Sequence, residues 1–161
     1  MPTSQTALAS FITPDALLKH WQAHRRLTRR TIEAFPDDKF DSFSIGGMRS
    51  FSALAAEMLG MAEPTVRGIV TGKWDEFSMK PAKTRAEVLR QWDESTKQLD
   101  ALWPKIPAAR FHEVTTAFGQ YTMPVHDLVL YVVDNEIHHR GQGYVYLRAL
   151  GIEPPPFWQR D

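Results

Sequence analysis

Towards its C-terminal end the chain reads Asp134-Asn135-Glu136-Ile137-His138-His139-Arg140-Gly141-Gln142, a dense run of polar and charged residues. The flanking residues between Pro124 and Leu150 are mainly apolar, at the spacing of an α-helix. Gly151 provides a left-handed stop, and the prolines at 154–156 prevent continuation. The sequence therefore predicts a long final helix, apolar at both ends and polar at its centre.

Within this polar centre, Asn135, His139 and Gln142 share one helix face, because they stand at positions i, i+4 and i+7. His138 is rotated by about 100° from His139. Two readings are open. The residues form either a ligand site or a buried polar network that fixes the register of the helix.

Three further segments show helical spacing, at about 13–35, 50–70 and 84–103. Thr13-Pro14-Asp15 and Thr84-Arg85-Ala86-Glu87 are typical helix starts, the second a capping box. Pro64 predicts a kink or a split in the second segment, near residues 60–63. Residues 111–122 indicate an irregular loop or a short hairpin. We expect an all-α four-helix bundle with long connecting loops, as one domain over residues 1–161 with its core at about 13–151.

The amino-acid composition argues against several classes of function. The 161 residues carry 19 Lys+Arg against 19 Asp+Glu and no cysteine, so thiolate chemistry is excluded and nucleic-acid binding is disfavoured. The basic run Arg25, Arg26, Arg29 and Arg30 is interpreted as a solvated helix face. No secretory signal or membrane span of roughly 18 apolar residues is evident, so we expect a cytoplasmic protein without membrane contact.

Two apolar segments are candidates for packing or contact with other proteins. Trp74, Phe77 and Met79 stand in the connector 71–83, which is expected to pack over one end of the bundle as a lid. Phe157-Trp158 follows the last helix. His20 and His24 stand four residues apart in the first helix, and we interpret them as a solvent-facing or core-edge pair.

The motif of the last helix resembles a known family. The run from His138 to Gln142, followed by Val145-Tyr146-Leu147-Arg148-Ala149-Leu150-Gly151-Ile152 and Pro154-Pro155, looks like the closing signature of DinB/YfiT-like proteins. Met48-Arg49-Ser50-Phe51, the helix through Ala62-Glu63, and Gly72-Lys73-Trp74 stand where that family has its second helix and the following loop. The resemblance covers about residues 13–156.

The resemblance implies a bundle in which three histidines hold a divalent metal, one from the second helix and two spaced by four residues on the last. Its members include thiol-dependent transferases and isomerases and metal-dependent hydrolases, often homodimeric. Matching by position places Met58, Asn135 and His139 on the three ligands. An amide and a thioether bind zinc or nickel weakly, so no tightly held metal is expected. Glu57 is rotated by about 100° from Met58 and is expected to point elsewhere.

The alternatives for the site therefore differ in their chemistry. His24 could complete an altered zinc or nickel site. Without metal, the same positions predict a pocket in which His139 acts as general acid or base. Its other expected residues are Trp21, His24, Met58, Trp92, Asn135, His138 and Gln142.

Three functions follow. The first is a DinB-like, homodimeric small-molecule binder or stress-related partner with a degenerate metal site. The second is a metal-dependent hydrolase or thiol-dependent transferase with an altered ligand set. The third is a protein-interaction bundle that uses the exposed aromatic residues.

Overall fold

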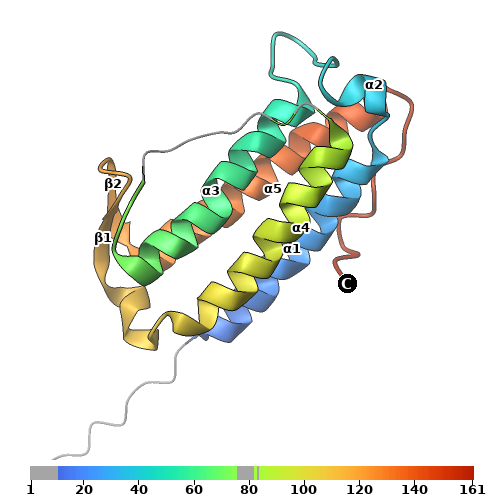
Figure 1. Cartoon of the computed structure of the whole chain (residues 1–161). Helices are drawn as coiled ribbons and strands as arrows, with labels where there is room; N and C mark the ends of the chain where they lie inside the picture. The colour runs from blue at the N-terminus through green and yellow to red at the C-terminus, as the bar shows by residue number, and fades with distance from the viewer. Residues whose placement is uncertain (1–10, 76–81, 83) are drawn as a thin grey trace, which may run out of the picture.

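The computed structural model describes residues 11–75, 82 and 84–161, and its main body is a bundle of four long helices (Figure 1). The helices are α1 (Pro14–Ala34), α3 (Phe51–Thr71), α4 (Arg85–Leu102) and α5 (Val125–Ala149). Each packs against two others: α3 contacts α4 and α5, and α1 contacts the same pair. The predicted bundle is confirmed, and its consecutive helices α1 and α3 lie diagonally, which a long connection allows.

The helix starts follow the predicted caps. Thr13 Oγ1 accepts a hydrogen bond from the Ala16 backbone N–H (3.1 Å), and Thr84 Oγ1 accepts one from that of Glu87 (3.3 Å). The predicted split of the second helix is wrong, because α3 continues through Pro64. A proline removes one hydrogen bond, and the packing of α3 between α4 and α5 maintains the rest of the helix.

The connections contain the remaining elements. The short helix α2 (Asp37–Phe40), which was not predicted, interrupts the first connector. Two 3₁₀ turns, η1 (Trp103–Lys105) and η2 (Ala108–His112), lead from α4 to an antiparallel hairpin of β1 (Val114–Ala117) and β2 (Tyr121–Pro124). The hairpin is one of the two predicted alternatives for this region. It lies at one end of the bundle and α2 at the other (Figure 1).

The core consists of two apolar clusters joined by a polar belt. The cluster at the hairpin end includes Trp21, and the cluster at the α2 end includes Met58 and Trp92. Between them in the sequence of α1 and α5 lie seven buried polar residues. His24, Arg25, Thr28, Glu136 and Arg140 form the polar belt, and Thr31 and His139 are the other two. The polar centre predicted for the last helix therefore lies inside the bundle, between the two apolar clusters.

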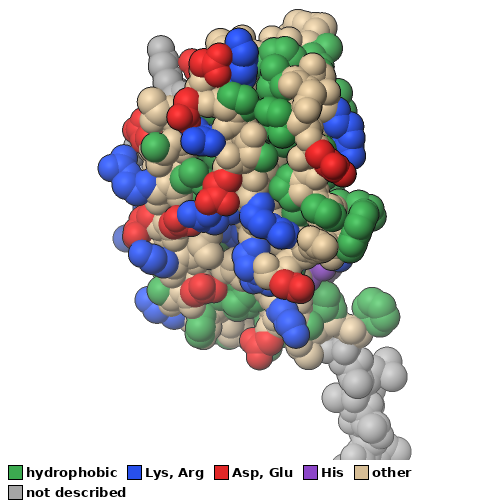
Figure 2. Space-filling model, turned by 90° about the vertical axis from the view of Figure 1, so that its right-hand side faces the viewer, with side chains coloured by type: hydrophobic (Ala, Val, Ile, Leu, Met, Phe, Trp, Pro, Cys, Tyr) green, Lys and Arg blue, Asp and Glu red, His purple; other side chains and the backbone are tan. Residues whose placement is uncertain are grey.

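The surface agrees with the neutral composition. On the face drawn in Figure 2, basic and acidic side chains are interspersed. Among the residues that the structure describes, no helix is both long and apolar enough to cross a membrane. Phe157 and Trp158 are 65% and 67% exposed, whereas Trp74 is half-buried and lies edge-to-face with Phe118. Phe77 and Met79, which were assigned to a lid, lie outside the described residues.

Candidate functional site between α3 and α5

A polar group joins the middle of α3 to the middle of α5. Glu57 Oε1 on α3 accepts a hydrogen bond from Asn135 Nδ2 (3.0 Å) and lies 3.0 Å from His139 Nε2. Asn135 and His139 stand one helical turn apart on α5, and their nitrogens are separated by 3.2 Å. Three side chains from two helices therefore meet around one carboxylate oxygen.

Further polar contacts extend this group in both directions. Arg49 Nη1 donates to the second oxygen of Glu57 over 2.6 Å. On the other side, His139 Nδ1 lies 3.4 Å from Gln142 Oε1, and Gln142 Nε2 donates to His138 Nε2 over 3.0 Å. Both ring nitrogens of His139 thus face side-chain oxygens, Nε2 that of Glu57 and Nδ1 that of Gln142.

The charges in this group are complementary. Burial raises the pKa of Glu57, but hydrogen bonds from His139, Asn135 and Arg49 outweigh that effect and lower the pKa to about 2. The carboxylate is therefore ionised at neutral pH. His139 is 5% exposed, while His138 lies on the surface, so the group connects a buried imidazole to solvent.

The structure brings together four of the predicted site residues, Asn135, His138, His139 and Gln142, and adds Glu57. Glu57, the neighbour of Met58, makes the contacts with Asn135 and His139 that were expected from position 58. Met58 is 2% exposed and belongs to an apolar cluster. Successive helical residues point about 100° apart, so only one of this pair can face α5. The sequence signal that favours Glu57 over Met58 is a carboxylate that interrupts the apolar face of α3.

The predicted aromatic walls lie elsewhere. Trp21 is fully buried and donates from Nε1 to Glu136 Oε2 (3.2 Å), and Trp92, 1% exposed, donates to the Arg25 backbone carbonyl (3.1 Å). Both indoles therefore have core roles with satisfied N–H groups. Neither hydrogen-bonds to any residue of the Glu57 group.

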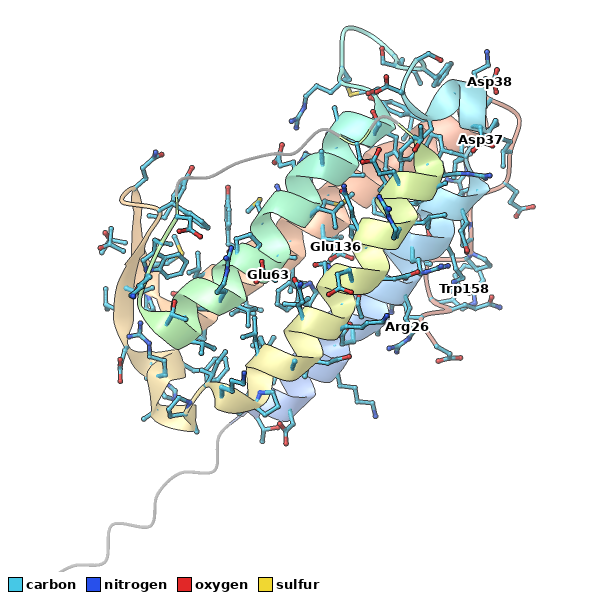
Figure 3. The ribbon with its side chains drawn as sticks, viewed as in Figure 1. Arg26, Asp37, Asp38, Glu63, Glu136 and Trp158 are labelled. Atoms are coloured by element: carbon cyan, nitrogen blue, oxygen red, sulfur yellow. The ribbon has the colours of Figure 1, made fainter. Side chains whose placement is uncertain are left out.

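The polar belt is a second network, separate from this group. Figure 3 shows Glu136 within the bundle. Its carboxylate accepts from Thr28 Oγ1 (2.6 Å) and lies 3.9 Å from Arg25 Nη1. The interpretation of Arg25 as part of a solvated face is wrong: it is 1% exposed, and its guanidinium stacks on Trp92 at 4.2 Å. The sequence feature that could have indicated this network is Glu136 itself. A carboxylate in a largely apolar helix needs a counter-charge when it is buried.

His24 belongs to this belt and not to the Glu57 group. Its Nδ1 lies 3.0 Å from Arg140 Nη2, and its Nε2 lies 3.0 Å from Arg160 Nη1 in the C-terminal segment. Burial, with the nearby charges of Arg140, His20 and Arg160, lowers the pKa of His24 to about 4. The buried imidazole is therefore neutral at physiological pH, and it anchors the segment after α5.

The fold and the polar group together define a four-helix bundle whose distinctive side chains lie between its second and fourth long helices. The DinB family model matches residues 1–160, and the chain belongs to the DinB family. An uncharacterised Bacillus subtilis protein, YjoA, is 23% identical over 149 residues, covering 91% of this chain and 96% of that protein.

Solved structures share the fold at low sequence identity. A DinB-like protein from Bacillus cereus has a TM-score of 0.71 at 16% identity, over 91% of this chain and 99% of that one. The crystal structure of YjoA gives 0.70 at 18% identity, over 90% and 99%. A mutant of a mycothiol-dependent maleylpyruvate isomerase gives 0.62 at 12% identity, over 81% of this chain and 60% of that one.

The residues at the family's metal position do not fit a tightly held zinc or nickel ion. No group of three His, Asp or Glu side chains suited to a metal occurs among the described residues. Asn135 turns its amide nitrogen, not its oxygen, to the centre, and both oxygens of Glu57 already accept hydrogen bonds. The set offers one imidazole, where zinc sites use three or four strong ligands.

Proposed function

We propose that this DinB-family protein binds a small ligand without a tightly held transition metal, and that the Glu57 group contacts that ligand. The observation that supports the proposal is the closed arrangement at Glu57 Oε1, which receives Asn135 Nδ2 and lies 3.0 Å from His139 Nε2. Glu57 contacts both α5 side chains, and Asn135 Oδ1 is buried with no hydrogen-bond partner among the described residues. Arg49 adds a positive charge beside the carboxylate, as a metal would.

The weakest contact in the group is where a ligand can enter. His139 Nδ1 and Gln142 Oε1 are 3.4 Å apart, longer than the other hydrogen bonds of the group. A carbonyl or carboxylate oxygen of a ligand that replaces the Gln142 oxygen accepts a shorter hydrogen bond from the Nδ1–H group. Glu57 meanwhile holds the imidazole in one orientation, the arrangement required of a general acid or base.

The competing function is a metal-dependent hydrolase or thiol-dependent transferase that holds its ion through Glu57, Asn135 and His139. Elemental mass spectrometry of protein purified without an affinity tag distinguishes the two, with His139→Ala as the control. We expect metal well below one equivalent per chain in both proteins. Metal near one equivalent that disappears in His139→Ala would overturn the proposal.

Ligand binding needs its own measurement. A thermal-shift screen of small carbonyl and carboxylate compounds is run on the wild-type protein and on His139→Gln, which keeps a polar side chain but loses the imidazole. We expect compounds that stabilise only the wild-type protein. A screen in which no compound stabilises the wild-type protein more than His139→Gln would contradict a ligand contact at His139.

A further inference from the structure

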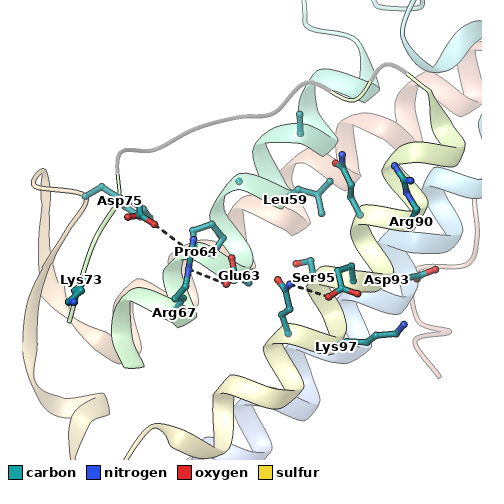
Figure 4. Close-up of a pocket in the computed structure, with 16 residues that line it drawn as sticks. Leu59, Glu63, Pro64, Arg67, Lys73, Asp75, Arg90, Asp93, Ser95 and Lys97 are labelled. Atoms are coloured by element: carbon teal, nitrogen blue, oxygen red, sulfur yellow. Dashed lines mark hydrogen bonds and ion pairs between the residues drawn. The ribbon is translucent and has the colours of Figure 1, made fainter. Parts of the chain in front are cut away.

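A groove lies between α3 and α4 (Figure 4), lined by residues other than those of the Glu57 group. Its volume is about 1050 Å³, in the range of small-molecule pockets. Part of its lining is apolar, from Ala56, Leu59 and Pro64 on α3 and from Phe118 in the hairpin. None of the side chains of the Glu57 group lines it.

Ser95 gives the groove an unsatisfied polar group. This α4 residue lines the groove and is 7% exposed. Its Oγ is buried and has no hydrogen-bond partner among the described residues. Buried hydroxyls in proteins almost always have partners, so an unpaired one beside a groove indicates a missing group. A ligand oxygen seated in the groove supplies that partner.

The acidic side chains of the groove are already engaged. Arg67 Nε lies 3.2 Å from Glu63, and Arg67 Nη1 lies 3.4 Å from Asp75. The remaining two acids have other partners, Arg29 for Asp93 (2.6 Å) and Gln98 for Glu94 (3.1 Å). The Arg29 hydrogen bond holds the pKa of the Asp93 carboxyl below its usual range. Each of the four acidic side chains thus already has a partner.

Three of the four basic side chains of the groove, all except Arg67, have no such partner in the ranges that the structure describes. Lys73, Arg90 and Lys97 line it, and none of them forms an ion pair within the described part of the chain. Lys97 helps to lower the pKa of Asp93 without forming an ion pair with it. Arg90 and Lys97 stand seven residues apart on α4, on the same helix face. The groove therefore combines free cations, an apolar wall and one unpaired hydroxyl.

We propose that this groove is a second ligand site, which takes a small organic anion with an apolar body. The anionic group pairs with Arg90 and Lys97, the body covers Leu59, Pro64 and Phe118, and an oxygen of the ligand hydrogen-bonds Ser95. Apolar contact with an added charge pair favours such an amphiphile over a purely polar ion or a neutral hydrocarbon.

The test uses octanoate as the probe, with 1-octanol and acetate for comparison, in titration calorimetry on the full chain. Arg90→Gln/Lys97→Gln is the test variant. Lys19→Gln/Lys105→Gln is the control, because it removes the same charge from exposed residues outside the groove. We expect octanoate to bind more tightly than either comparison compound. The test variant should weaken octanoate binding about tenfold, a loss typical of a charge pair, and the control should leave it unchanged.

Ser95→Ala tests the hydroxyl without risk to the fold. Removing an unpaired buried oxygen should leave the unliganded protein at least as stable in urea, yet weaken the binding of a hydroxyoctanoate, which carries a second oxygen on its chain, more than the binding of octanoate itself. His139→Gln should leave octanoate binding unchanged, which separates this site from the Glu57 group. Equal binding of octanoate and 1-octanol, equal losses in the two double variants, or no octanoate binding would each overturn the proposal.

Discussion

At the scale of single residues, the contacts of Glu57 change which substitutions would rebuild a metal centre. Glu57 meets Asn135 and His139, whereas Met58 points into the core. Glu57→His/Asn135→His should therefore create a three-imidazole site with His139. Zinc would bind near one equivalent in calorimetry, because three imidazoles are an established zinc ligand set.

Glu57→Gln/Met58→His/Asn135→His is the matched control, since it also adds two histidines to the same two helices and removes the Glu57 carboxylate, which with two imidazoles would itself be a zinc ligand set. A histidine at 58 enters an apolar cluster and cannot share an ion with position 135, so weak or no zinc binding is expected. Tighter binding by this control than by the first variant would mean that α3 has the opposite orientation.

The same pair of residues shows how far the site was predictable. The polar run on α5 and its shared face were read correctly, because the spacing of Asn135, His139 and Gln142 is internal to one helix. Whether residue 57 or residue 58 faces α5 depends on the rotation of α3 about its own axis. That rotation is set by tertiary contacts. Arg25 was misread for the same reason, since Glu136 and Trp92, its partners, lie on other helices.

At the scale of helices, one glycine sets the contact between α3 and α5. A Cβ built on Gly143 would collide with the ring of Phe51, while one on Gly141, two residues earlier on the same helix, would meet nothing within 4 Å. Gly143→Ala should therefore lower the free energy of unfolding by about 1–3 kcal/mol, because the stacked Phe51 and Phe35 rings cannot yield freely.

Gly141→Ala is the control, and helix propensity predicts a gain of up to about 1 kcal/mol. Urea unfolding followed by circular dichroism measures both. A neutral or stabilised Gly143→Ala protein would show that α5 lies further from α3 than this structure has it.

The ends of the helices were predicted mainly from local sequence signals. The Thr13 and Thr84 caps and the Gly151 stop lie within one turn of the ends that they define. The split expected at Pro64 failed because that rule describes an isolated helix. In the bundle, contacts of α3 with two neighbours outweigh the loss of one hydrogen bond.

For the whole molecule, the polar belt holds three of the long helices together. Arg25 on α1 donates from Nε to Thr96 Oγ1 (3.0 Å) and from Nη2 to the Trp92 carbonyl (3.2 Å), both on α4, and faces Glu136 on α5. Burial opposes the charge on both partners, raising the pKa of Glu136 and lowering that of Arg25. Such a pair contributes little net stability, but losing one partner exposes the full cost of burying the other.

Glu136→Gln should accordingly cost about 3 kcal/mol in urea unfolding at neutral pH, since Arg25 is left charged and unpaired. Asp93→Asn, which breaks the half-exposed pair with Arg29, should cost no more than about 1 kcal/mol. Arg25→Met/Glu136→Gln should be more stable than Glu136→Gln alone, because the Arg25 charge is no longer buried without a counter-charge, while Arg140 has the same surroundings in both variants. If Glu136→Gln lowered the free energy of unfolding no more than Asp93→Asn, water would have to solvate the belt. The two apolar clusters would then be separated by water and not joined by the Arg25–Glu136 pair.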